Sequence, residues 1–167
     1  AQEPASLMRP ELFEPHLVEV EQGRRLNLRS VGAGSPTVIF EQGGEGMIYN
    51  WRKVQPAIEA MTRTCVYDRG GFGWSDPPRY PVTAVSVSDD LHALLEKAGV
   101  SGPLVLVGHS VGGFYATMYA DRFPDQVAGL VLVDPGFSGQ MSGLKGDRWI
   151  LERAQVARGG ANLLRCA

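Results

Sequence analysis

Apolar and polar positions along the chain predict two exposed strands first, and then strands that alternate with helices. Leu17 to Glu21 and Arg25 to Ser30 alternate apolar with polar residues, as half-exposed strands do, and Gln22-Gly23-Arg24 predicts a hairpin-like turn between them. Short apolar runs rich in β-branched residues then predict buried strands at Thr37 to Phe40, Thr64 to Tyr67, Pro103 to Val107 and Val127 to Val133.

Residues at helical spacing lie between these runs. Asn50 can cap a helix running to about Met61, although Pro56 should break or restart it. A second helix is expected to begin at Ser86 or Ser88 and to end at Gly99, with an apolar face of Leu91, Leu94, Leu95 and Ala98. A third helix should follow Gly113 and end before Pro124. Its apolar residues on one side would be Phe114, Met118 and Phe123. This alternation predicts βαβ units and a parallel sheet that is covered on both faces.

The pattern divides the chain into three parts. Residues 1–16, with three prolines, are expected to form an N-terminal arm. Residues 17–136 form the α/β core, and residues 137–167 read as the start of a cap or C-terminal helical segment, with a helix expected over Asp147 to Ala157.

Composition narrows the class of protein. A length of 167 residues suits one domain with a substantial core, and a net charge of −2 without a basic cluster argues against a nucleic-acid partner. No apolar run approaches membrane-spanning length. The start at Ala1, without an initiator Met, is typical of a mature end left by signal-peptide cleavage and predicts a secreted or periplasmic protein. A trimmed chain and a cytoplasmic location stay open, as does a disulfide between Cys65 and Cys166.

One stretch carries the strongest chemical signal. The run from Pro103 to Gly113 reads as a strand, a tight turn and a helix, and the turn has the pattern G-x-S-x-G around Ser110. Glycines two residues either side remove Cβ atoms that would clash with a strained serine, whose hydroxyl then projects above the sheet. Ser110 is therefore the candidate nucleophile. The alternative is a glycine-rich turn that holds an incidental serine.

Two further loops should share the edge at which Ser110 lies, because ligands on parallel sheets bind beyond the carboxyl ends of the strands. One is the glycine loop after Phe40, and the other follows Tyr67. Asp68 and Asp76 are expected to hold the second loop through hydrogen bonds to backbone N–H groups.

Three motifs together resemble the α/β-hydrolase fold family from about Leu17 to Pro135: Gly108-His109-Ser110-Val111-Gly112-Gly113, Tyr67-Asp68-Arg69-Gly70-Gly71-Phe72-Gly73-Trp74-Ser75-Asp76 and Leu130-Val131-Leu132-Val133-Asp134-Pro135. The resemblance implies an α/β three-layer sandwich with a mostly parallel central sheet. It covers the N-terminal part of that fold and lacks the family's C-terminal strands.

The same resemblance implies roles for individual residues. Ser110 would be the nucleophile, and the backbone N–H of Val111 would be one oxyanion-hole donor. Gly44 or Gly43 would supply the other from a loop where many relatives have His-Gly and this chain has Gln42-Gly43.

Asp134 stands where some α/β hydrolases carry the acid of the triad, although in many others the equivalent aspartate is structural, which is the interpretation favoured here. No metal or cofactor is indicated.

The catalytic base is missing from this pattern. The family order is Ser, acid, His, yet no histidine follows Ser110. His109 should pack under the turn, His92 should fill space beside an apolar helix face, and His16 precedes the sheet.

Two classes of function follow. The first is a serine hydrolase that acts on a small ester-like molecule through an acyl-enzyme at Ser110. The second is a weakly active or non-catalytic module, and a lyase or an acyltransferase on the same fold also stays open. Because Val127 to Val133 reads as a strand buried on both faces, something should cover its edge. We expect a second copy, a second polypeptide that completes the sheet, or the helix over Asp147 to Ala157.

Overall fold

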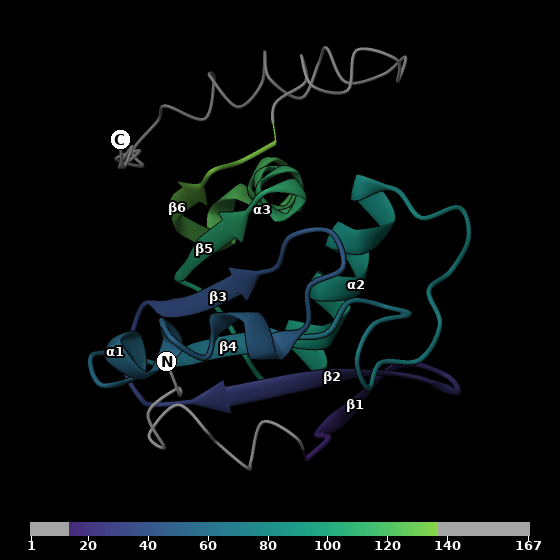
Figure 1. The fold of residues 1–167 in the computed structure, drawn as a ribbon, viewed down its shortest axis with the longest axis horizontal. Helices are drawn as coiled ribbons and strands as arrows, with labels where there is room; N and C mark the ends of the chain where they lie inside the picture. Colours follow the sequence, from purple (N-terminus) through teal and green to yellow (C-terminus); the bar gives the residue numbers. More distant parts are fainter. Residues whose placement is uncertain (1–13, 137–167) are drawn as a thin grey trace, which may run out of the picture.

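A computed structural model describes residues 14–136 (Figure 1). Six strands are present: β1 (Leu17–Glu21), β2 (Arg24–Val31), β3 (Thr37–Glu41), β4 (Thr64–Tyr67), β5 (Leu104–His109) and β6 (Val127–Val133). The helices are the 3₁₀ turns η3 (Ile48–Trp51) and η4 (Pro124–Gln126) and the α-helices α1 (Gln55–Glu59), α2 (Ala84–Lys97) and α3 (Val111–Arg122).

The strands form a single mixed sheet in the order β1-β2-β4-β3-β5-β6. β1 pairs with β2 and β2 with β4 in antiparallel fashion, whereas β4, β3, β5 and β6 run parallel. The predicted α/β class with a mostly parallel sheet is confirmed. Because β3, β4, β5 and β6 are parallel, the segments that follow them emerge at the same edge.

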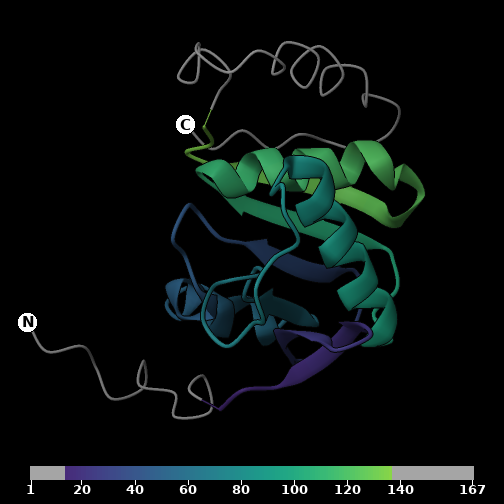
Figure 2. The ribbon, with the colours of Figure 1, turned by 90° about the vertical axis from the view of Figure 1, so that its right-hand side faces the viewer.

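Helices cover both faces, which makes three layers (Figures 1 and 2). Alternate side chains of the central strands, such as Ile39 and Leu106, pack against α2 and α3. The intervening residues, such as Phe40 and Val66, pack against Ile48 and Trp51 of η3 on the opposite face. This is the two-sided burial that continuous apolar runs in parallel strands require.

The helix boundaries differ from expectation in three places. No helix runs from Asn50 to Met61: Asn50 lies within η3, and α1 restarts with Pro56 in its first turn, where a missing N–H costs nothing. α2 begins at Ala84 and not at Ser86 or Ser88, because Thr83 is the N-cap and the Ser86 side chain closes a capping box. α3 begins at Val111 and not after Gly113, and it buries Ala116, Met118 and Tyr119, whereas Phe114 is only half-buried.

Two aspartates anchor the loop after β4, as predicted. Asp68 accepts hydrogen bonds from the backbone N–H groups of Ile48 (2.9 Å) and Trp74 (3.2 Å). Asp76 accepts one from the N–H of Arg25 (2.7 Å), and this bond is the main cause that lowers the pKa of Asp76. The loop is thereby tied to η3 and to β2.

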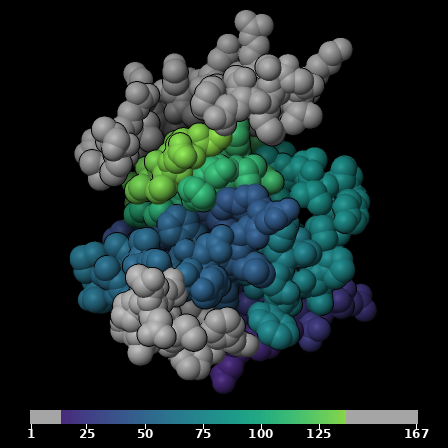
Figure 3. Space-filling view, in the orientation of Figure 1, coloured from purple at the N-terminus to yellow at the C-terminus, as the bar shows by residue number. Residues whose placement is uncertain are grey.

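β6 lies at one end of the sheet, opposite the β1–β2 hairpin, as the yellow-green and purple surfaces show (Figure 3). Its side chains are half-buried or exposed, and Val133 is 41% exposed, so the expectation of burial on both faces is wrong for the described residues. Among the described strands, β6 pairs with β5 alone. The predicted helix over 147–157, most of the arm and Cys166 lie outside residues 14–136. Cys65 is buried in β4.

Candidate active site

Ser110 occupies the sharp turn between β5 and α3. Its φ of 53° and ψ of −125° lie in a region that non-glycine residues rarely adopt. A Cβ on Gly108 would lie 2.6 Å from the carbonyl oxygen of Gly112, and a Cβ on Gly112 would lie 2.6 Å from that of Glu41. The two glycines therefore let strand, helix and the end of β3 meet around the serine.

The loop after β3 passes beside this turn. A Cβ on Gly43 would lie 3.4 Å from Cβ of Ser110, so the loop backbone and the serine are close neighbours. Gly43 is buried and Gly44 is exposed. Val111 is the first residue of α3, and N–H groups at a helix N-terminus have no intrahelical partner and lie at the positive end of the helix dipole. The structure thus brings Ser110, Val111 and Gly43 together.

A buried arginine holds the loop from the opposite side. Nη1 of Arg69 donates to the carbonyl oxygen of Gln42 (2.6 Å), and Nη2 donates to those of Gly43 and Gly44 (2.6 Å to Gly44). Nη1 also pairs with Oε1 of Glu41 at 2.6 Å. The Arg69 side chain is 6% exposed and that of Glu41 is 2% exposed, so this is an ion pair removed from water.

The direction of these bonds determines where the loop amides point. In a trans peptide the C=O of one residue and the N–H of the next point in opposite directions. Because the carbonyls of Gln42 and Gly43 face Arg69, the N–H groups of Gly43 and Gly44 face away from it. Arg69 therefore fixes the orientation of both amides that sequence reasoning nominated as oxyanion donors.

Tyr67 completes the support beneath the loop. Its hydroxyl donates to Oε2 of Glu41, and its backbone oxygen accepts from Nε2 of Gln42. Burial raises the pKa of Glu41, whereas the guanidinium of Arg69 and the hydroxyl of Tyr67 oppose that rise. Burial and the neighbouring carboxylate also raise the pKa of Tyr67 well above its usual range, so the phenol keeps its proton and stays a donor.

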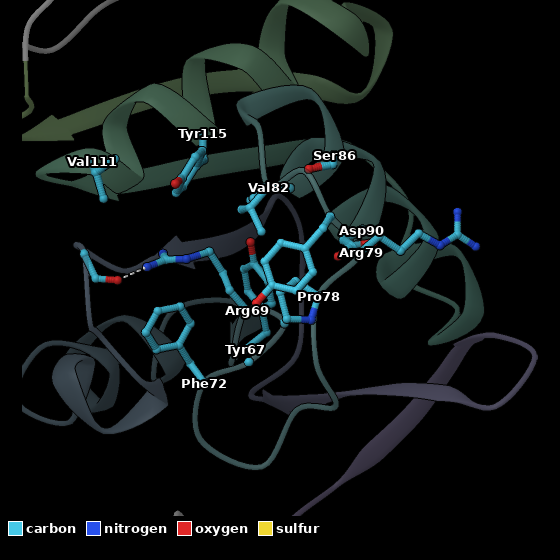
Figure 4. A pocket seen from close by; sticks show the side chains of 15 residues that line it. Tyr67, Arg69, Phe72, Pro78, Arg79, Val82, Ser86, Asp90, Val111 and Tyr115 are labelled. Carbon is cyan, nitrogen blue, oxygen red and sulfur yellow. Dashed lines mark hydrogen bonds between the residues drawn. The ribbon is translucent and has the colours of Figure 1, made fainter. Parts of the chain in front are cut away.

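A cavity of about 560 Å³ opens beside the turn (Figure 4). Gly44 and Val111 form one end of its lining. From there it continues between Tyr115 of α3, Phe72 of the loop after β4, and α2. A small molecule in this cavity can therefore lie against Gly44 and Val111.

Two of the histidines, His16 and His92, lie at the edge of the sheet opposite to Ser110. His16 lines a different cavity together with Gly34 and Arg63, which precede β3 and β4, so it lies at the amino edge of these strands. His92 stacks on Phe123 (ring centroids 3.9 Å apart) and lines a third cavity with Gly102, also at the amino edge, as a space-filling residue would.

His109 lies beside the turn and not beneath it. The expectation that it packs under the turn is wrong: His109 is exposed, and a Cβ on Gly43 would lie 2.9 Å from its Nδ1.

Asp134 follows β6 in a segment bonded to the serine backbone. The N–H of Ser110 donates to the oxygen of Val133 (3.2 Å), and the N–H of Gly136 donates to the oxygen of Ser110 (3.1 Å). Asp134 itself is exposed with φ of 42°. The segment is close to the nucleophile candidate, and the aspartate sits in the bend that makes this closeness possible.

Sequence reasoning missed the Arg69–Glu41 pair, although a signal was present. Glu41 directly follows the apolar run of β3, and Arg69 follows that of β4 by two residues. Charged residues of opposite sign, placed after neighbouring parallel strands, meet at the carboxyl edge. The order of the elements along the chain does not by itself show that β3 and β4 are neighbours in the sheet.

Comparison with known proteins places the chain in a family. Residues 36–156 match the model of the alpha/beta hydrolase fold. The chain is 31% identical over 127 residues to the cis-3-alkyl-4-alkyloxetan-2-one decarboxylase of Shewanella oneidensis, covering 74% of this chain and 39% of that protein. It is 34% identical over 102 residues to the human (lyso)-N-acylphosphatidylethanolamine lipase, covering 59% of this chain and 30% of the lipase.

Among solved structures, one match is Est816, an N-acyl homoserine lactone degrading enzyme, with a TM-score of 0.69 and 25% identity over 78% of this chain and 49% of that one. The chain thus spans less than half the length of each of these three proteins. Within residues 14–136, no helix combines the length and apolar character that crossing a membrane needs. The fold, the strand order around Ser110 and the match over residues 36–156 show that this chain belongs to the alpha/beta hydrolase fold family.

Proposed function

We propose that the protein is a serine hydrolase that cleaves a small carboxylic ester through an acyl-enzyme at Ser110. One observation carries the proposal: a serine in a strained turn lies against a loop whose amides are oriented by a buried arginine. A turn that served only to join β5 to α3 would not need this strain, nor a guanidinium bonded to three successive carbonyls. Relatives named as a lipase and as a lactone-degrading enzyme support hydrolysis.

The mechanism follows from the geometry. Oγ of Ser110 attacks the acyl carbon while its proton passes to a base, and the C–O bond to the alcohol then breaks as the alcohol takes up a proton. The N–H groups of Val111 and Gly44 donate to the oxygen that becomes negative in the tetrahedral intermediate, each contributing about 3 kcal/mol. Water attacks the acyl-enzyme in the second half and regenerates Ser110.

The base lies outside the histidines described above. His16 and His92 are at the amino edge of the strands, and His109 is an exposed residue whose ring lies against Gly43. The proposal therefore assigns the base to residues outside 14–136 or to another polypeptide. The second candidate, a non-catalytic module that associates through the β6 edge, is favoured by the pairing of β6 with β5 alone among the described strands.

A fluorophosphonate probe separates the two candidates, because it reacts with activated serines and not with ordinary ones. The proposal expects a single adduct that peptide mapping places on Ser110 and that disappears in Ser110→Ala. His109→Ala should keep the adduct, since the neighbouring imidazole is not assigned as base. No adduct on a chain whose circular dichroism shows an intact fold would reject the hydrolase in favour of the module.

A further inference from the structure

We propose that the cavity beside Ser110 binds an uncharged, apolar acyl chain of the substrate. This inference rests on the proposed hydrolysis at Ser110 and names the part of the substrate that the described residues recognise. Three features of the cavity support it: its continuity with the oxyanion corner, the pairing of every charge at its wall, and its apolar lining.

The cavity begins where the reacting carbonyl would lie. Gly44 and Val111, the proposed oxyanion donors, belong to its lining, and Tyr115 follows one helical turn after Val111. An acyl carbon bonded to Ser110 with its oxygen on these amides would therefore lie at the cavity, where its substituent has room to enter. A volume of about 560 Å³ lies in the range of roughly 300–1,000 Å³ that small-molecule sites occupy.

Each charged side chain that lines the cavity has a partner of opposite charge within the protein. Arg69 is bonded to Glu41. Asp90 accepts from Nη1 of Arg24 (2.9 Å).

At the outer rim, Nε of Arg79 donates to Oε1 of Glu21 (2.7 Å). A charged group on the ligand would have to compete with these partners and lose its own hydration as well. The lining thus selects against a carboxylate or an ammonium on the acyl chain.

Most of the remaining wall is apolar or aromatic, and the hydroxyl of Ser86 is bonded to Thr83 (Figure 4). The apolar and aromatic side chains come from β4, the loop after it, α2 and α3: Tyr67, Phe72, Pro78, Val82, Val87 and Tyr115. Burial of one methylene among such side chains is worth about 0.8 kcal/mol, which corresponds to about fourfold in affinity. Affinity should therefore rise with chain length until the cavity is full.

Binding of simple alcohols tests this without any turnover. Hexanol, heptanol, octanol and nonanol would compete with the neutral fluorophore Nile red for the full-length chain. We expect about fourfold tighter competition for each added methylene and then a plateau. Analogues with a terminal carboxylate or amine on the same chain should bind at least about tenfold more weakly, because the cavity offers no unpaired partner. A flat series, or equal binding of the charged analogues, would overturn the inference.

Two valines on α2 give a matched pair of variants. Val87 lines the cavity, whereas Val85 is two residues away, 37% exposed and not part of the lining. Val87→Trp should fill part of the cavity, so that alcohol affinity stops rising at a shorter chain length. Val85→Trp should leave the dependence of affinity on chain length unchanged. Val82→Trp, on the exposed loop, repeats the test if Val87→Trp does not fold. Identical series for the cavity variants and for Val85→Trp would place the alcohols elsewhere.

The outcome can be separated from that of the proposed hydrolysis. Ser110→Ala should bind the alcohols as the parent chain does, since no bond to Oγ is involved. Alcohol binding of the expected kind without a fluorophosphonate adduct would reject the hydrolase and leave an apolar ligand site. An adduct on Ser110 without dependence on chain length would keep the hydrolase and reject the acyl site.

Discussion

At the scale of single residues, Ser110 has a strained backbone conformation with a positive φ. Residues held in such sparsely populated conformations cost about 1–3 kcal/mol each. Glycine adopts positive φ without that cost, although its greater freedom in the unfolded chain offsets part of the gain.

Ser110→Gly is therefore expected to raise the free energy of unfolding by about 1 kcal/mol relative to Ser110→Ala, which keeps a Cβ. Denaturant titration of both variants measures the difference, and both should lose the fluorophosphonate adduct. Equal stability of the two variants would show that the turn is not strained in solution.

Under the proposed function, Arg69 would be a positioning residue, because it would act through the loop that it holds. Arg69→Met leaves the carboxylate of Glu41 buried without its partner, which should lower the free energy of unfolding by about 3–5 kcal/mol. Adding Glu41→Gln removes the uncompensated charge, so the double variant should be more stable than Arg69→Met alone. Urea titration of the parent chain, of Arg69→Met, of Glu41→Gln and of the double variant completes a double-mutant cycle.

The same variants distinguish positioning from mere stability. Glu41→Gln/Arg69→Met should react with the fluorophosphonate more slowly, by about tenfold or more, while its reversible affinity for the probe stays near that of the parent chain. Arg69→Lys should not restore the rate, because an ammonium cannot span three carbonyls as a planar guanidinium does. An unchanged rate in a stable double variant would remove Arg69 from the site.

At the scale of elements, the site depends on how closely α3 approaches the end of β3. A Cβ at Gly112 would collide with backbone oxygens of Glu41 and Gln42, which cannot move as a flexible side chain can. Gly112→Ala is therefore expected to destabilise the protein by about 1–3 kcal/mol and to slow the labelling of Ser110.

Gly129→Ala in β6 is the matched control, since its Cβ would meet only side-chain atoms of Val105 at 3.6 Å or more. Thermal unfolding of the two variants should separate them clearly, with Gly129→Ala at or above the parent chain. A tolerated alanine at Gly112 would mean that helix and loop are not in contact.

The elements themselves were largely predictable from the sequence, because each depends on a local pattern. Apolar runs predicted the positions of all four parallel strands, and Gly99, with φ of 64°, ended α2 as expected. Helix starts were less predictable. Both Thr83 and Ser86 could be the N-cap of α2, and the hydrogen bonds between them show that Thr83 is the N-cap. The Arg69–Glu41 pair needed the knowledge that β3 and β4 are neighbours, which is a property of the sheet and not of either segment.

At the scale of the whole molecule, the described residues form a sheet with one open side. The resemblance predicted the family correctly, whereas the roles of Ser110, Gly44, Gly43, Val111 and Asp134 stay predictions, as do the domain limits at residues 16 and 136 and a secreted or periplasmic location. Partners and localisation depend on surfaces and signals that spacing along a chain does not encode.

The open side makes a testable prediction about assembly. If β6 pairs with a second copy, the average mass from light scattering should rise with concentration towards that of a dimer. Ala128→Lys puts a charge at an exposed position of β6 and should hold the chain monomeric, since lysine on an edge strand opposes strand pairing. Ala33→Lys, at an exposed loop position, controls for added charge. A mass independent of concentration in the parent chain would contradict pairing between copies.

The bonds between Ser110 and Val133 and between Gly136 and Ser110 connect that outer strand to the backbone of the proposed nucleophile. A polypeptide that docks along β6 would consequently lie one strand from Ser110 and would stabilise the bend at Asp134, whose flanking residues bond to Ser110. Completion of the sheet would then speed the reaction of Ser110 with the probe, and a paired copy would outpace a solitary one.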